Sequence, residues 1–426
     1  MTTVKSEKSK KFAASEVMDN FIKNIEVLRW FVKYIKPEAA AHDVAINNEL
    51  EKLKKAIGDD LRSIPERITE PAEEGGSRKA TLQLSEEEIE KTVQKIIDIS
   101  QDYQKLWWLI SGEVEVLHRS ALIMLASYFD CFLSDLISGY YIIHPEGLDK
   151  ELSISASELR SCADIEEALE LIVNKKIENI SYKGLEDQKA FMKNFLKIDL
   201  KENLIDWNLI NETIERRNIL VHNNGIINNR YLKRVSVSGV QEESQTIKLG
   251  ERLIVSDEYF NKVIDEILVA SVILMQICWR KWMKDSAKDA DRNLLSHFFP
   301  MKVLGQYDVL KRLGLFAKEI KVHGDGTRHE LDMYYCLAIK EKGESAKLKE
   351  ELSKFDESTL TPHEMLYVSG LKNDIASFYE NLKKPDSVKG MIKTEFLRDP
   401  IFKDFRSNDS YEKMIEEAIG HGKDVS

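Results

Sequence analysis

Residues that interrupt helices are scarce in this chain, which has 8 prolines and 19 glycines among its 426 residues. An all-β protein needs a turn every few residues and draws mainly on these residue types for it. Their scarcity therefore disfavours an all-β fold and favours long helices joined by short connections. The chain is long enough for two or three domains of usual size.

Cysteine is scarce too, and its four positions are far apart: Cys131, Cys162, Cys278 and Cys336. None of them forms a C-x-x-C pair of the kind that binds zinc or catalyses redox reactions. Each has apolar or mixed neighbours of helical character, so we expect reduced thiols that lie in the core of a cytoplasmic protein.

Long apolar runs are also few. Residues 1–11 contain no apolar segment, so no signal peptide is expected. Residues 267–279 form the most apolar run, which is shorter than the roughly 20 residues that span a bilayer. Residues 121–143 form a longer run, but it includes Asp130 and Asp135, which predicts a buried helix. We therefore expect no membrane partner.

Several common catalytic motifs are missing. The chain has no G-x-x-x-x-G-K-[ST] phosphate loop, no H-E-x-x-H zinc helix and no G-x-S-x-G nucleophile turn. Its nine histidines do not cluster with acidic residues at metal-ligand spacing, so we expect no metal and no cofactor. The net charge of −11 argues against a non-specific nucleic-acid coat but is compatible with a local basic site.

Hydrophobic periodicity divides the chain into three predicted regions. Residues 1–100 read as an N-terminal helical region, 101–285 as a central helical domain and 286–426 as a set of shorter helical pairs. The last region resembles a tetratricopeptide-like array, although no clean repeat period is present and an unrelated helical bundle is the alternative. The one expected β-hairpin covers residues 246–255, with its turn near Gly250.

A basic segment stands out in the central region. The residues from Arg216 to Arg234 include Arg217, Arg230 and Lys233 as well, and they contain no acidic residue. In an acidic protein this segment is a local positive island, which would attract a phosphate-bearing ligand. A solvated basic face without a ligand is the alternative interpretation.

The predicted helix over residues 203–222 adds a pattern of polar side chains to this island. Asn218 and His222 are four residues apart and therefore share one helix face, and Arg217 is adjacent to them. Asparagine is unfavourable inside a helix because its side chain competes for backbone hydrogen bonds, so a purely structural helix has little reason to contain this pattern. The following residues 223–225, Asn-Asn-Gly, are typical of a helix end.

These residues resemble a known family. Arg217-Asn218-x-x-x-His222 matches the R-x(4–6)-H signature of HEPN domains, and the extended motif is similar to the RiboL-PSP-HEPN-like branch. Residues 118–136 resemble the first long helix of that branch, with Asp130 at its acidic position. The resemblance covers about residues 100–284. The matching positions of the motif are Arg216, Arg217, Asn218, Val221, His222, Gly225, Tyr231 and Leu232.

The resemblance implies an all-α HEPN helical bundle and a metal-independent endoribonuclease. In this family two protomers pair as a C2 homodimer so that both motifs face one cleft, and the ribose 2′-OH attacks the adjacent phosphorus. RNA is then cut to 2′,3′-cyclic phosphate ends. The catalytic residues would be Arg217, Asn218 and His222, and the RNA-binding residues Arg216, Arg230, Lys233 and Arg234.

The biological role implied by analogy is that of a toxin or antiviral defence effector, with an antitoxin or defence-system protein as a partner. The alternative is a catalytically silent HEPN module that binds RNA or another protein. Three further features have two interpretations each. Arg292 and His297 repeat the motif spacing, so His297 is either the catalytic histidine or, in a decoy motif, an interdomain or core histidine. Tyr231 either stacks on a base or lies in the core, and the lysine-rich stretch 175–201 either guides RNA or is a solvated face.

Overall fold

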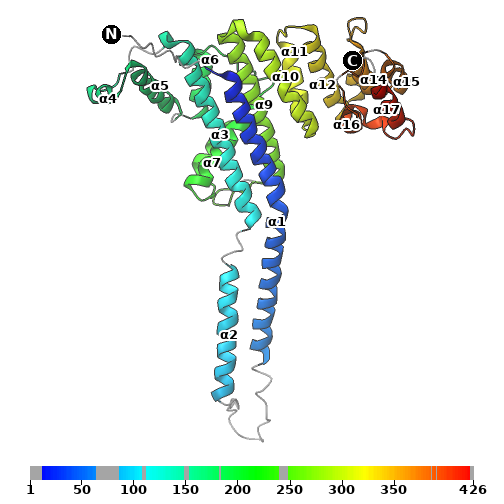
Figure 1. Cartoon of the computed structure of the whole chain (residues 1–426). Helices are drawn as coiled ribbons and strands as arrows, with labels where there is room; N and C mark the ends of the chain where they lie inside the picture. The colour runs from blue at the N-terminus through cyan, green and yellow to red at the C-terminus, as the bar shows by residue number, and fades with distance from the viewer. Residues whose placement is uncertain are drawn as a thin grey trace, which may run out of the picture.

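Helices make up all the regular secondary structure in the part of the chain that this computed structural model describes, which confirms the predicted all-α fold (Figure 1). The structure describes residues 12–63, 86–107, 112–147, 153–181, 184–238, 248–384, 386–389 and 391–422.

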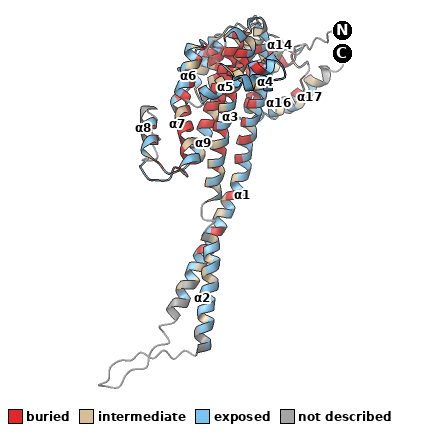
Figure 2. Ribbon diagram, turned by 90° about the vertical axis from the view of Figure 1, so that its left-hand side faces the viewer, coloured by how far each residue is buried: buried red, intermediate tan, exposed pale blue. Residues whose placement is uncertain are grey.

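A long helical arm projects from the body of the molecule (Figures 1 and 2). Helix α1 (Ala14–Ser63) has 50 residues, which corresponds to about 75 Å. Its first half packs on α3 (Glu113–Ile143) and α9 (Asp257–Trp282), while its second half pairs with α2 (Glu86–Trp107) to form the arm. Asp43 of α1 accepts hydrogen bonds from the backbone N–H groups of the first two residues of α3, and these bonds satisfy donors that a helix start leaves unpaired.

The body is a bundle around α9, whose residues between Ile267 and Met275 are almost all inaccessible to solvent. Both α3 and α7 (Trp207–His222) pack on α9. A helix that is apolar all round is expected at the centre of such a bundle. The smaller elements of this part are η2 (Pro145–Gly147), α4 (Ala156–Ser161), α5 (Ile165–Ser181), α6 (Leu185–Asn194) and α8 (Asn229–Ser238).

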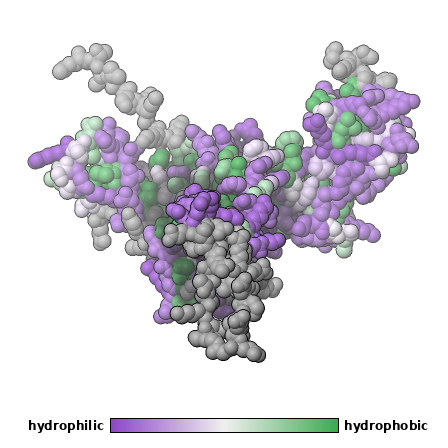
Figure 3. All heavy atoms as spheres, turned by 90° about the horizontal axis from the view of Figure 1, so that it is seen from below, coloured by the Kyte–Doolittle hydropathy of each residue, from purple (hydrophilic) through white to green (hydrophobic). Residues whose placement is uncertain are grey.

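The C-terminal helices continue the bundle and then form a second hydrophobic core. The first core runs from Ala14 to Ala338, and the second runs from Met333 to Ile415, so α12 contributes to both. Seen from below, the C-terminal helices on the right are covered mainly by hydrophilic residues (Figure 3). The elements are η3 (Lys284–Ser286), α10 (Ala287–Val303), α11 (Tyr307–Glu319), α12 (Asp325–Glu341), α13 (Ser345–Leu352), α14 (Pro362–Lys372), α15 (Ile375–Leu382), α16 (Lys393–Arg398), η4 (Pro400–Phe405) and α17 (Tyr411–Gly422).

The cores divide the chain differently from the three predicted regions. Residues 1–100 were expected to be separate from the central domain, but Met18, Phe21, Ile25 and Leu28 of α1 are buried in the same core as α3 and α9. The predicted boundary at residue 285 also has no counterpart, because that core continues through α10 and α11. Sequence periodicity shows which face of a helix is buried, but it does not show against which helix.

The predicted β-hairpin over residues 246–255 is wrong within residues 248–255, the part of it that the structure describes. The chain does turn there, since Glu251 N–H donates to the Lys248 carbonyl. The arm after the turn pairs with the loop after α7, through an isolated bridge between Ile226 and Arg252 and a hydrogen bond from Leu253 N–H to the Gly225 carbonyl. Its backbone groups are therefore satisfied by a distant segment.

Helix α3 is the one described helix that is long and apolar enough to cross a membrane by length and composition. Half of its most apolar window is buried against the rest of the structure. Its residues Phe129, Phe132 and Leu136 lie in the first hydrophobic core, as the sequence predicted for a buried helix.

Candidate functional site

Helix α7 carries the predicted motif, and nearby residues explain where the helix begins and where it ends. The side chain of Asp206 accepts a hydrogen bond from the backbone N–H of Leu209 at 3.0 Å, which caps the start of the helix. The helix ends at His222, where Asn224 and Gly225 adopt positive φ values of 48° and 77°. The expected helix end at residues 223–225 is therefore confirmed, and it leaves His222 in the last turn.

Arg217 is held by an acidic residue of α3. Its Nη2 atom lies 2.5 Å from Oδ2 of Asp130, and the two side chains are 25% and 33% exposed. Burial raises the pKa of Asp130, and the nearby guanidinium opposes that shift. The Nε atom of Arg217 is buried without a hydrogen-bond partner in the described part of the chain. The result is an oriented guanidinium that still reaches solvent and has a free donor.

Asn218 and His222 are on the same helix as Arg217, one and five residues after it. The side chain of His222 is exposed, whereas Asn218 is half-buried one turn earlier. Within the described residues the imidazole of His222 has no hydrogen-bond or ion-pair partner. Both of its nitrogens are thus available to exchange protons with a bound substrate.

Two further basic residues lie at this end of α7. Arg119 of α3 donates to the side chain of Asn224 at 3.3 Å, and Arg252 bridges to Ile226 of the same loop. Both arginines also pair with Glu115. The sequence analysis missed them because they are more than 25 residues from His222 in the chain; only the loop packing brings them near it.

The structure corrects the role predicted for Arg216. This residue is fully buried, and its Nε atom donates to Glu212 while Nη1 donates to the carbonyl of Ile254 at 3.2 Å. Its guanidinium carbon lies 3.8 Å from the centroid of the Tyr259 ring. Successive helix residues point about 100° apart, so Arg217 reaches the surface while Arg216 turns inward. A buried Arg216 is not placed to contact RNA.

The hydroxyl groups of Tyr231 and Tyr259 complete the buried cluster by donating to Glu212, at 3.2 and 2.6 Å. Burial raises the pKa of both tyrosines, so their hydroxyls stay protonated and remain donors. Tyr231 is therefore a core residue, and the base-stacking interpretation does not fit its position.

The remaining residues of the basic island lie on α8. Arg230 and Lys233 are exposed, and Arg234 pairs with Glu215 of α7 at 2.5 Å. With Arg216 and Arg217 also paired, much of the positive charge counted in the sequence is offset by acidic residues that lie outside the counted segment. The positive electrostatic potential around this segment is therefore weaker than the sequence implies.

The two residues of the decoy motif lie in different environments. Arg292 is 77% exposed and pairs with Asp289, whereas His297 is buried and its Nε2 N–H donates to Oδ1 of Asn293 at 3.2 Å. Burial lowers the pKa of His297 to about 4. An arginine and a histidine that face different environments do not form a common site.

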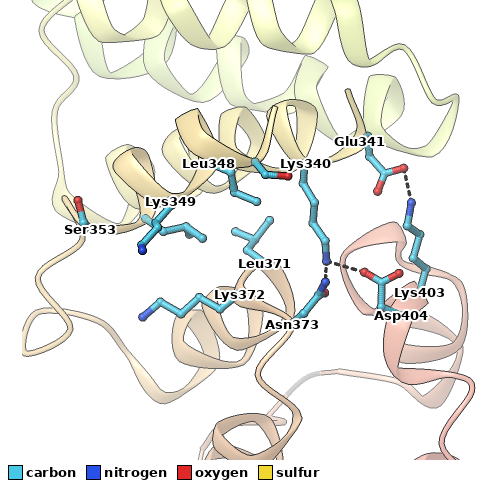
Figure 4. A pocket seen from close by; sticks show the side chains of 12 residues that line it. Lys340, Glu341, Leu348, Lys349, Ser353, Leu371, Lys372, Asn373, Lys403 and Asp404 are labelled. Atoms are coloured by element: carbon cyan, nitrogen blue, oxygen red, sulfur yellow. Dashed lines mark hydrogen bonds and ion pairs between the residues drawn. The ribbon is translucent and has the colours of Figure 1, made fainter. Parts of the chain in front are cut away.

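A separate groove of about 660 Å³ lies among α12, α13, α14 and η4 (Figure 4). Lys340 reaches across it to Asn373 and Asp404, and Lys403 pairs with Glu341. These contacts join neighbouring helices to one another, and the lining residues come from elements other than α7. In the residues that the structure describes, no group of three or more potential metal ligands gathers at this groove or elsewhere.

Comparison of the chain with protein-family models, curated protein sequences and solved structures finds no match. The arrangement of Asp130, Arg217, Asn218 and His222 is therefore the basis for a functional assignment.

Proposed function

We propose that this chain is a metal-independent endoribonuclease of the HEPN type that acts in the cytoplasm as a toxin or antiviral defence effector. The observation that supports the proposal best is the contact between α3 and α7, where Asp130 holds Arg217 five residues before the exposed His222. Asp130 and Arg217 are 87 residues apart in the sequence, and the fold brings together the acidic position of the first long helix and the motif arginine.

The proposed reaction is an internal transfer at phosphorus. The ribose 2′-OH loses its proton to an imidazole and attacks the adjacent phosphorus, the bond to the 5′ oxygen breaks, and that oxygen takes a proton to leave as a hydroxyl. The products are a 2′,3′-cyclic phosphate and a 5′-OH end. Arg217 would stabilise the negative charge that develops on the phosphorane oxygens, and Asn218 would orient the substrate or His222.

A second copy of the chain would complete the site, because one imidazole accepts a proton while another group donates one. The contacts Arg217–Asp130 and Arg119–Asn224 show that α3 and α7 run antiparallel. Met124 on α3 and Val221 on α7 are both exposed to solvent. We expect a C2 homodimer in which these apolar residues are covered and the two His222 side chains share one cleft.

One observation favours a second candidate function. Arg217 is already paired with Asp130, and Glu212 and Glu215 offset two further arginines of the island. A catalytically silent HEPN module that binds RNA weakly, or binds an antitoxin or defence-system protein, would be compatible with this reduced charge. Such a module would bind RNA with a salt-dependent affinity but would release no cyclic phosphate ends.

The test uses the purified full chain with single-stranded RNA in EDTA. Cleavage to 2′,3′-cyclic phosphate ends is expected, and His222→Ala and Arg217→Ala should each abolish it while circular dichroism stays unchanged. Arg292→Ala, in the decoy motif, is the matched control and should cut normally. Activity that survives His222→Ala, or that requires a divalent metal, would refute the mechanism, and RNA binding without any cleavage would favour the silent module.

A further inference from the structure

Helix α1 has an exposed apolar face. Val27, Trp30, Phe31 and Tyr34 are each about half exposed to solvent, and their spacing of three and four residues places them on one side of the helix. The opposite side of the same turns carries the buried residues that pack on α3 and α9. A surface helix normally has polar residues on its outer face, so this segment is apolar on both sides.

The exposed side chains form a continuous, ordered surface. The rings of Trp30 and Tyr34 lie 3.9 Å apart between centroids, so each restricts the motion of the other. Beside them a groove of about 690 Å³ lies between α1 and the turn after α10, where Leu304 is also exposed. Exposed apolar patches of this kind mark protein interaction sites, and large aromatic residues dominate the binding energy of such sites.

Opposite charges lie at the two ends of this face. Lys23 lies seven residues before Trp30, and Glu38 lies seven residues after Phe31. Both side chains are exposed, and neither has an ion-pair partner within the described residues. The face is therefore apolar in the middle, positive at one end and negative at the other, at equal distances from its centre.

We propose that this face binds the same face of a second copy of the chain, with the two α1 helices antiparallel and a two-fold axis between Trp30 and Phe31. A two-fold interface requires a surface that complements itself. In this register Trp30 lies opposite Phe31 of the second copy, and Lys23 lies opposite Glu38. Antiparallel pairing thus joins apolar to apolar and, at both ends, positive to negative. An unrelated partner helix would not require this symmetry of charge.

This interface is distinct from the proposed cleft at His222. Both α1 and α7 pack on α3 and α9, and Figure 1 shows α7 to the left of α3 and α1 to its right. Pairing through α1 therefore leaves the end of α7 uncovered. If both contacts form, the chain assembles beyond a dimer, and each contact can be removed without the other.

The experiment is analytical ultracentrifugation of the full chain with charge-reversed variants. Lys23→Glu places two acidic residues opposite each other at both ends of the interface, and Glu38→Lys places two basic ones. Each is expected to raise the dissociation constant of the α1 contact about tenfold or more, because like charges that face each other across an interface are repelled. The double variant with both changes should recover the wild-type assembly, and so should a mixture of the two single variants.

Phe31→Asp tests the apolar centre and should abolish the contact at micromolar concentration. Lys55→Glu is the matched control, since it makes the same charge change on α1 in the arm, away from the face, and should assemble as the wild type does. Thermal unfolding of each variant shows whether the fold is intact. The proposal is overturned if the single reversals leave sedimentation unchanged, or if the double variant fails to recover it. RNA cleavage, measured in parallel, reports on the proposed function independently.

Discussion

Mutation of Arg216 should lower the unfolding free energy much more than mutation of its neighbour Arg217. In Arg216→Ala, Glu212 loses its cation and remains a buried carboxylate that is 1% exposed. Removing one partner of a buried ion pair typically costs about 3–5 kcal/mol of unfolding free energy. In Arg217→Ala, the remaining Asp130 is one-third exposed and has a raised pKa, so it can take up a proton or water. The loss there should be about 1 kcal/mol or less.

Urea unfolding followed by circular dichroism, together with the RNA cleavage assay, measures both effects. Arg216→Ala should lower the unfolding midpoint strongly, whereas Arg217→Ala should keep the midpoint near the wild-type value and abolish cleavage. The double variant Glu212→Gln with Arg216→Met leaves no unpaired buried charge, so it should be more stable than Arg216→Ala. The reasoning is refuted if Arg216→Ala unfolds like the wild type, or if Arg217→Ala is the more destabilised of the two.

Three further predictions concern stability. Burial lowers the pKa of His297 to about 4 from 6.5. The folded protein therefore has its full stability above pH 6.5 and loses up to about 3 kcal/mol as the pH falls towards 4, because the unfolded chain takes up the proton more readily. The urea midpoint of His297→Gln should depend less on pH in that window than the midpoint of the wild type. Asp399→Ala leaves Lys302, 5% exposed, buried without its partner and should cost about 3–5 kcal/mol in urea unfolding, whereas equal midpoints would contradict this. Gly314→Ala puts a Cβ atom 2.7 Å from the ring of Tyr335, and calorimetry should show a loss of about 1–3 kcal/mol.

Local information was sufficient for the secondary structure of the motif helix. The apolar spacing predicted a helix that ends near residue 222, and the structure ends α7 at His222, because Asn224 and Gly225 tolerate positive φ without tertiary support. The scarcity of proline and glycine likewise predicted a helical chain, since few positions can end a helix. The end of a helix and the helical character of a segment depend on residues within a few positions of one another, so both can be predicted from the sequence alone.

Contacts between distant segments decided which residues are buried, which charges are paired and where the backbone near Gly250 finds its partners. The sequence presents Arg216 and Arg217 as equivalent neighbours, but Glu212 and Tyr259 bind one inside the core while Asp130 holds the other at the surface. The charge of the basic island was overestimated for the same reason, because its acidic partners lie outside the segment. The expected hairpin near Gly250 is replaced by pairing with the loop after α7. In each case a side chain or backbone group takes the partner that packing brings within reach, and only the tertiary structure determines which partner that is.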